Sequence, residues 1–254
     1  MWLNIEQLYN SLMRSIFSKI NANIVTPGPL SIYRKSALEK LKGFSEKGFS
    51  EDVDIAVRLI RNGYRIGFNE NAVAMTNMPY TARGFLKQRS RFARGWVDIF
   101  KKHLQLNSTI IDIYSLPLAL FTYVQGVIFG AITLYTIITG YLIYFVAQGI
   151  YINFVVLRYF TEWLSVIGTI RWIIDILHGN TPLTFIGFIS LITFLLSYPL
   201  YIVSIIRFDR KLSIRHIFPL MFMPPFWLVI MTIYIVNLPE CFRKHQQNVW
   251  EKIN

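Results

Sequence analysis

The hydrophobic positions of this chain are concentrated in its second half. Residues 113–157 contain no charged side chain, and this run of 45 residues fits a hairpin of two membrane spans better than one span of about 20 residues. Two later segments, 183–206 and 217–236, are each long enough to cross a bilayer. With a first turn at 136–140, we expect four spans, near residues 114–136, 139–158, 182–206 and 216–237.

The segment between the second and third expected spans has a different pattern. Within residues 158–179, charged side chains interrupt a helical spacing of apolar ones. Each charge in the bilayer core would cost roughly 2.5–3.5 kcal/mol on insertion scales. We therefore expect residues 160–178 to lie flat at the membrane surface.

The first half of the chain mixes helical and strand-like patterns. Helical spacing is present in residues 3–20, 36–41, 51–61 and 81–103. The helix after Ser50 is expected to bury Val53, Ala56, Val57 and Ile60 and to end at Asn62-Gly63. Short strands are expected at 30–33, 64–68 and 72–76. This mixture predicts half of an α/β domain.

Charge divides the chain in the same way. The whole chain is 54% hydrophobic, residues 1–105 have a net charge of +9, and residues 106–254 have a net charge of only +3. A basic front on an apolar membrane protein is typical of the cytoplasmic side and of contact with anionic lipid headgroups. A nucleic-acid partner would also suit a basic segment, but the apolar second half favours the membrane. The single cysteine, Cys241, excludes an internal disulfide, and residues 1–20 do not resemble a signal peptide.

Two polar clusters are the candidates for chemistry. Ser50-Glu51-Asp52-Val53-Asp54 places an acidic pair at a helix start, and Gln88-Arg89-Ser90-Arg91-Phe92 lies on the later basic helix. A carboxylate can take a proton from a hydroxyl, while arginines can hold a departing phosphate group. The acidic pair could instead be only favourable helix-start residues. The basic helix, with aromatic residues on one side, could be only a membrane-surface anchor.

The ordered motifs resemble the second half of membrane-embedded family 2 glycosyltransferases, such as cellulose, chitin and hyaluronan synthases. The segments that carry the resemblance are 28–34, 43–44, 51–54, 63–66 and 88–92 with Gly95. It implies a partial, GT-A-like α/β glycosyltransferase domain in residues 1–105, with an interfacial helix at 81–105. An all-α transmembrane domain with interfacial helices would follow in residues 106–254. The protein would be a multi-pass cell-membrane protein with residues 1–105 in the cytoplasm.

The resemblance also implies residue roles. Asp52, with Glu51 beside it, would be the general base of an inverting transfer, and the substrate-binding residues would be Asp54, Gln88, Arg89, Arg91, Phe92 and Trp250. Phe92 stands where the family usually has tryptophan, and Ser50 where several relatives have threonine. The implied partners are the membrane, a nucleotide-sugar and a polysaccharide or lipid-linked acceptor, with no nucleic acid.

The family's donor-binding half and its Asp-x-Asp metal ligands are not found in this sequence. Mg²⁺ or Mn²⁺ is expected for the family, but this chain is expected to supply no metal ligand. We therefore expect transfer to need a separate or missing donor-binding half. The alternatives are a non-catalytic scaffold or truncated remnant, or an unrelated small transporter, which the charge-poor spans oppose.

Overall fold

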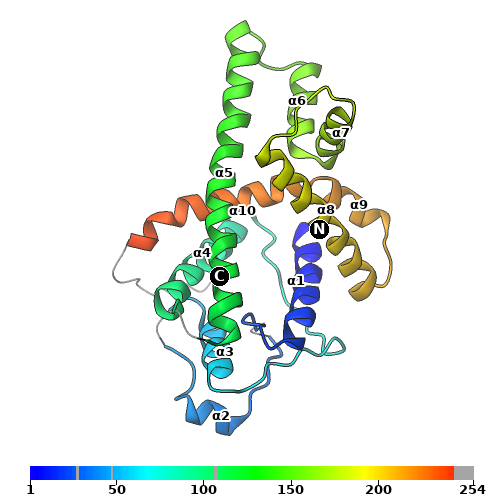
Figure 1. Ribbon diagram of the computed structural model, residues 1–254. Coiled ribbons are helices and arrows are strands. Elements are labelled where there is room, and N and C mark those ends of the chain that lie inside the picture. Colours follow the sequence, from blue (N-terminus) through cyan, green and yellow to red (C-terminus); the bar gives the residue numbers. More distant parts are fainter. Residues whose placement is uncertain (27–28, 47, 106–107, 243–254) are drawn as a thin grey trace. The chain divides into compact units, whose positions relative to one another are not determined.

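The structure is a computed structural model that describes residues 1–26, 29–46, 48–105 and 108–242. Figure 1 shows helices joined by loops. The helices of the first half are α1 (Trp2–Lys19), α2 (Lys35–Lys40), α3 (Glu51–Arg61) and α4 (Ala82–His103). Those of the second half are α5 (Leu116–Tyr144), α6 (Phe154–Leu164), α7 (Val166–Leu177), α8 (Phe185–Phe208), α9 (Ile214–Met221) and α10 (Met223–Asn237). A π-helical turn, η1 (Ile111–Ser115), leads into α5, and 3-10 turns η2 (Val146–Gln148) and η3 (Leu238–Phe242) follow α5 and α10.

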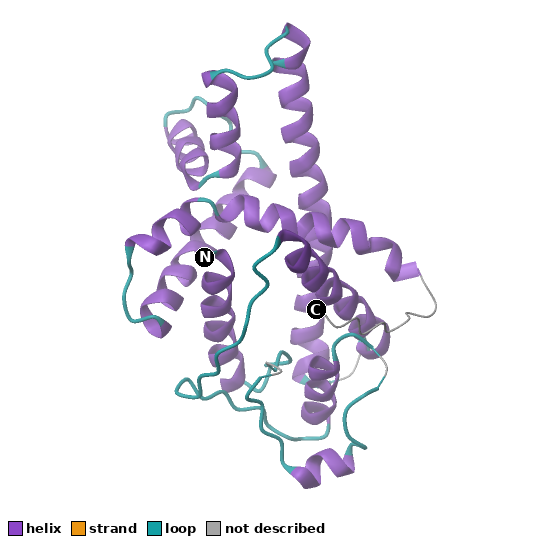
Figure 2. Ribbon diagram, turned by 180° about the vertical axis from the view of Figure 1, so that it is seen from behind, coloured by secondary structure: helices purple, strands orange, loops and turns teal. Residues whose placement is uncertain are grey.

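The prediction of an α/β, GT-A-like domain is wrong. The structure is 71% helical, and no strand occurs among the described residues, as Figure 2 also shows. The segments expected as strands, 30–33, 64–68 and 72–76, are loops. A strand is stable only as part of a paired ladder, and short apolar runs carry no information about whether a partner exists.

Side chains rather than neighbouring strands satisfy the backbone of one of these segments. The amide nitrogen of Asn21 donates to the carbonyl of Tyr64 at 3.1 Å, and its amide oxygen accepts from the N–H of Ile66 at 3.1 Å. This one side chain therefore bonds one acceptor and one donor of the segment, in the way that a paired strand would. In segment 72–76 the side chains of Val73 and Met75 are exposed, with no sheet to pack against.

The predicted hairpin turn at 136–140 is also wrong, because α5 continues through it to Tyr144. The hydroxyls of Thr136 and Thr139 donate to the carbonyls of Ile132 and Tyr135 one turn earlier, so these polar residues are satisfied within a helix. Gly140 provides space instead of a turn, since a Cβ there would overlap the hydroxyl of Tyr159 on α6.

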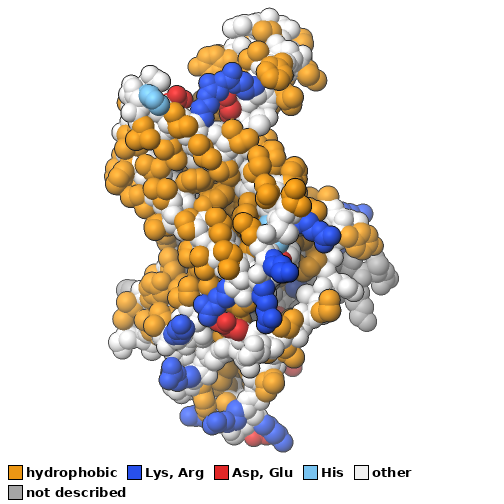
Figure 3. Space-filling model, turned by 90° about the vertical axis from the view of Figure 1, so that its right-hand side faces the viewer, with side chains coloured by type: hydrophobic (Ala, Val, Ile, Leu, Met, Phe, Trp, Pro, Cys, Tyr) orange, Lys and Arg blue, Asp and Glu red, His pale blue; other side chains and the backbone are white. Residues whose placement is uncertain are grey.

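Two helical segments of the described residues are long and apolar enough to cross a membrane, Ile111–Gln148 and Gly187–Phe208. A third span is possible if α9 and α10, bent by 51° at their junction, cross together. This differs from the four spans expected, because one long helix replaces the first hairpin. Figure 3 shows hydrophobic side chains exposed over broad areas of one face. Such exposure is rare in soluble monomers and supports membrane association.

The chain divides into two compact units. The first contains residues 1–12 and 130–229. In it, the helix expected at 160–178 is instead two helices, α6 and α7, separated at Ser165. Gly168 allows the close approach of the two, because a Cβ there would overlap the carbonyl of Glu162. Three of the charges in this region are paired, since Glu162 binds both Arg158, at 2.8 Å, and Arg171.

The second unit contains residues 13–129 and the segment from Ile230 onward, and α3 lies in its core. One face of α3, with Val53, Val57 and Ile60, packs against Ile99 of α4 and Ile111 of η1. Its opposite face packs on α2. The four residues expected to be buried on α3 are buried, and the helix ends at Arg61 before the left-handed Gly63, so this prediction is confirmed.

Candidate active site

The first turn of α3 carries the predicted catalytic carboxylates. Hydrogen bonds fix both the backbone and the side chain of Asp52. Its backbone carbonyl accepts from the hydroxyl of Thr26 at 3.0 Å, and its carboxylate accepts from the N–H of Val53 at 2.9 Å. Asp52 and Glu51 are both half-buried. The helix N-terminus favours their negative charge. The carboxylate of Asp52 is therefore fixed in place without being enclosed.

The surroundings of Asp52 make it a better base than a free aspartate. Burial raises the pKa of its carboxyl above the ordinary value, and the charge of Glu51 raises it further. The N–H of Val53 and the charge of Arg91 lower the pKa without cancelling this rise. A carboxylate with a raised pKa holds a proton more tightly and suits general-base catalysis.

The residues of the second cluster lie on α4 in two environments. Arg91 and Phe92 are exposed, and the Arg91 guanidinium lies 5.6 Å from the centre of the Phe92 ring. Gln88 is half-buried, and its amide oxygen is buried without a hydrogen-bond donor in the part of the chain that the structure describes. A buried polar atom without a partner is costly, so this oxygen is suited to receive a donor from a ligand.

Arg89 differs from its neighbours. It is buried, and its guanidinium lies 5.2 Å from the ring centre of Phe85 and 5.6 Å from that of Phe92. Phe92 therefore has cation–π contacts with the buried Arg89 and with the exposed Arg91. Arg89 is therefore placed to support Phe92 from within the protein, whereas Arg91 and Phe92 are accessible at the surface.

Helix α3 meets α4 at a glycine. A Cβ on Gly95 would overlap the hydroxyl of Ser50, the residue that precedes α3. Ser50 occupies the N-cap position, as predicted, but its side chain makes no capping hydrogen bond. The loop before it also approaches α4, because a Cβ on Gly48 would overlap the carboxylate of Asp98. These contacts set the distance between the start of α3 and the middle of α4.

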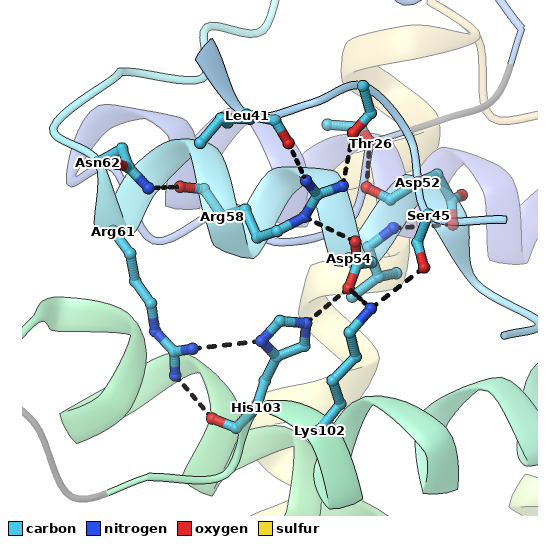
Figure 4. Close-up of polar contacts among 12 residues, drawn as sticks. Thr26, Leu41, Ser45, Asp52, Asp54, Arg58, Arg61, Asn62, Lys102 and His103 are labelled. Carbon is cyan, nitrogen blue, oxygen red and sulfur yellow. Dashed lines mark hydrogen bonds and ion pairs between the residues drawn. The ribbon is translucent and has the colours of Figure 1, made fainter. Parts of the chain in front are cut away.

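Asp54, predicted to bind substrate, instead has protein partners on both carboxylate oxygens (Figure 4). One oxygen lies 2.7 Å from Nε2 of His103 and 2.5 Å from Nζ of Lys102, and the other accepts from Nε of Arg58 at 2.7 Å. The side chain is only 4% exposed. Burial alone raises the pKa of Asp54, but the hydrogen bonds from His103 and Lys102 and the positive charges outweigh it and hold the pKa far below its ordinary value. Asp54 is therefore a structural anion in this conformation.

Sequence reasoning missed the partners of Asp54. The Asp54–Arg58 pair could have been found, because residues four apart lie on one helix face. Lys102 and His103 come from the end of α4. A further pair in this region joins Arg61 of α3 to Asp112 of η1. No spacing in the sequence indicates these contacts. Trp250 lies outside the described residues.

The described residues contain no group of three or more His, Cys, Asp or Glu side chains that could hold a metal ion. The Mg²⁺ or Mn²⁺ expected for the family therefore has no fitting set of ligands in this part of the chain.

Curated proteins with similar sequences are glycosyltransferases from bacteria and plants. The chain is 31% identical over 108 residues to "Probable glycosyltransferase YdaM" of Bacillus subtilis, covering 40% of this chain and 26% of that protein. It is 29% identical over 89 residues to an N-acetylglucosaminyltransferase of Bradyrhizobium diazoefficiens, covering 32% and 18%. It is 27% identical over 75 residues to "Probable glucomannan 4-beta-mannosyltransferase 7" of Oryza sativa, covering 30% and 13%.

The chain thus aligns with about a quarter or less of the length of these relatives. No solved structure matches it significantly. The family model "Glycosyl transferase family group 2", however, matches residues 7–238, which include α3, α4 and both candidate membrane spans. The chain belongs to glycosyl transferase family group 2.

Proposed function

We propose that this chain is the acceptor-side and membrane portion of a glycosyltransferase. It would move a sugar from a nucleotide-sugar to the hydroxyl of a growing polysaccharide or a lipid-linked acceptor. Family membership supports the reaction class. The two candidate membrane helices support a reaction at a membrane. The net charge of +9 in residues 1–105 is the ground for proposing that they lie on the cytoplasmic side.

The observation that carries the proposal is the contact between the start of α3, which carries Asp52, and α4, which carries Arg91. The Arg91 charge lowers the pKa of the Asp52 carboxyl, so its field reaches the base although the two residues are 39 positions apart in the chain. The apolar contact of α3 with α4 and the close contact of Ser50 with Gly95 keep them together. A base beside an exposed cation is the arrangement that sugar transfer from a diphosphate requires.

The proposed step is an inverting displacement. The acceptor hydroxyl gives its proton to Asp52 while its oxygen forms a bond to the anomeric carbon of the donor sugar. The bond from that carbon to the diphosphate breaks, and the diphosphate leaves with the electron pair. Arg91 stabilises the negative charge that develops, because its planar guanidinium can donate two parallel hydrogen bonds to phosphate oxygens. Phe92 offers a ring face to the sugar, and Gln88 lies one helical turn before it on α4.

The test uses membranes of the source organism, so that any further subunit is present. Transfer of radiolabel from UDP-N-acetylglucosamine and GDP-mannose is measured for wild type and for Asp52→Asn. We expect Asp52→Asn to lower incorporation at least about 100-fold, the usual contribution of a general base. Glu39→Gln on α2, which removes an exposed carboxylate, serves as the control and should change little. Full activity of Asp52→Asn would reject the proposal and favour a non-catalytic scaffold.

A further inference from the structure

We propose that His103 and Asp54 are positioning residues that connect the start of the membrane helix α5 to the first turn of α3 and thereby fix the catalytic carboxylate of Asp52. This inference rests on the function proposed above. It assigns a role in the reaction to a buried network whose members do not touch substrate. All of its residues lie in one compact unit.

The network begins two residues after Asp52. Asp54 binds Arg58 and Lys102 as well as His103. The guanidinium of Arg58 also contacts residues outside α3. Its two terminal nitrogens donate to the carbonyls of Leu41 at 2.7 Å and Gly43 at 2.8 Å. The first two turns of α3 are therefore bonded directionally both to the end of α4 and to the turn after α2.

His103 extends the network from Asp54 to Arg61 (Figure 4). It is 5% exposed, and its Nδ1 lies 3.2 Å from Nη1 of Arg61. Arginine nitrogens only donate, so Nδ1 must accept, and the proton of the neutral ring must then be on Nε2, where it is donated to Asp54. Arg61 also donates to the carbonyl of His103 at 2.6 Å and to the carboxylate of Asp112 in η1. A continuous path of polar contacts thus runs from Asp54 through His103 and Arg61 to Asp112.

The directionality of these contacts gives them a role beyond stability. The apolar contacts of Val53, Val57 and Ile60 attract α3 to its neighbours, but the hydrophobic effect has no preferred direction. Hydrogen bonds with fixed donors and acceptors oppose such movement. Asp52 and Asp54 share the first turn of α3, so a movement of one moves the other. A displacement of about 1 Å at a reacting group can cost about 100-fold in rate.

The test compares His103→Leu, His103→Gln and the control His178→Leu, which makes the same replacement at an exposed histidine of the α7 C-terminus. Each full chain is assayed in native membranes for kcat and for KM of the nucleotide-sugar. We expect His103→Leu to lower kcat at least tenfold with KM changed less than twofold. His103→Gln keeps an N–H donor for Asp54 and should recover most of the loss, and His178→Leu should resemble wild type.

A second measurement does not depend on activity. Hydrogen exchange of the purified chain in nanodiscs should become at least tenfold faster in His103→Leu for the peptide covering residues 50–58, with α8 unchanged. Asp112→Asn, which keeps the size of the side chain, should also speed hydrogen exchange at residues 50–58. This variant replaces His103→Leu in the measurement if His103→Leu does not fold. Normal kcat in His103→Leu, or a loss that Gln does not recover, would overturn the inference. So would unchanged exchange at residues 50–58. A wild type without transferase activity would instead overturn the proposed function, while the exchange data would still decide whether the network holds α3.

Discussion

Ser50 at the start of α3 lies against Gly95 in the middle of α4 so closely that a Cβ on Gly95 would overlap the Ser50 hydroxyl. The two residues are 45 positions apart in the chain. Their contact places the acidic first turn of α3 beside the helix that carries Gln88, Arg91 and Phe92. A glycine is therefore needed at this point of α4 for its small size, although glycine lowers helix propensity.

Replacement of this glycine tests the contact. We expect Gly95→Ala to lower the free energy of unfolding by about 1–3 kcal/mol, the usual cost of overpacking, because Ser50 must move away. Transferase activity should fall by a larger factor than the folded fraction, since α3 carries Asp52. Gly67→Ala is the control, because a Cβ at Gly67 meets no atom within 4 Å. Thermal unfolding and radiolabel transfer measure the two effects. Wild-type behaviour of Gly95→Ala would show that the helices do not meet here.

The pH dependence of transfer tests the role of Asp52. Burial raises the pKa of Asp52, and a general base must be ionised to act, so kcat/KM should fall with acid at a pH above about 3.9, the ordinary value for aspartate. The Arg91 charge lowers this pKa, so Arg91→Gln should move the acid limb to still higher pH. Arg83→Gln, at an exposed position of the same helix, should leave the limb in place. An acid limb unaffected by Arg91→Gln would separate Arg91 from the base.

Acid should weaken the fold through Asp54. The pKa of Asp54 is lower in the folded chain than in the unfolded one, so its stabilising contribution is complete above about pH 3.9, the unfolded value, and is lost as the pH falls from there toward the folded pKa. Asp54→Asn should therefore cost about 3 kcal/mol near pH 7, the low end for a broken buried pair, because Lys102 and Arg58 are partly exposed. Wild type and variant should converge below about pH 4.

Thermal unfolding midpoints of the two proteins at pH 7, 5 and 3 measure this convergence. Glu39→Gln, which breaks an exposed ion pair with Lys35, should change the unfolding free energy by no more than about 0.5 kcal/mol. A difference between wild type and Asp54→Asn that stays constant down to pH 3 would contradict the assigned ionisation of Asp54.

The continuity of α5 can be tested by labelling. With Cys241 replaced by serine, we expect a cysteine at position 138 to resist a water-soluble maleimide in membranes, because it lies inside the helix that runs from Leu116 to Tyr144. A cysteine at position 152, in the loop before α6 and 92% exposed, should react once the reagent reaches its side of the membrane. Strong labelling at 138 would restore the hairpin turn that the sequence predicts.

The sequence by itself determined several helices of the first half of the chain and the family. Local signals were sufficient for α1, α3 and α4, because apolar spacing, the Thr81 cap and the left-handed Gly63 act within a few residues. The motif order around Asp52 and Arg91 led to the family that the match over residues 7–238 establishes. These properties depend on residues that are close in the chain.

Only the tertiary structure decided which segments have partners. Residues 64–68 would be a strand beside another strand, but instead Asn21 bonds the carbonyl of Tyr64 and the N–H of Ile66. Gly140 would end a helix in isolation, but packing against Tyr159 makes it an interior residue of α5. Asp54 would be a ligand-binding carboxylate on an open helix, but His103 and Lys102, about 50 residues away, enclose it. The energies of these contacts depend on what lies across the space between segments, and sequence spacing does not contain that information.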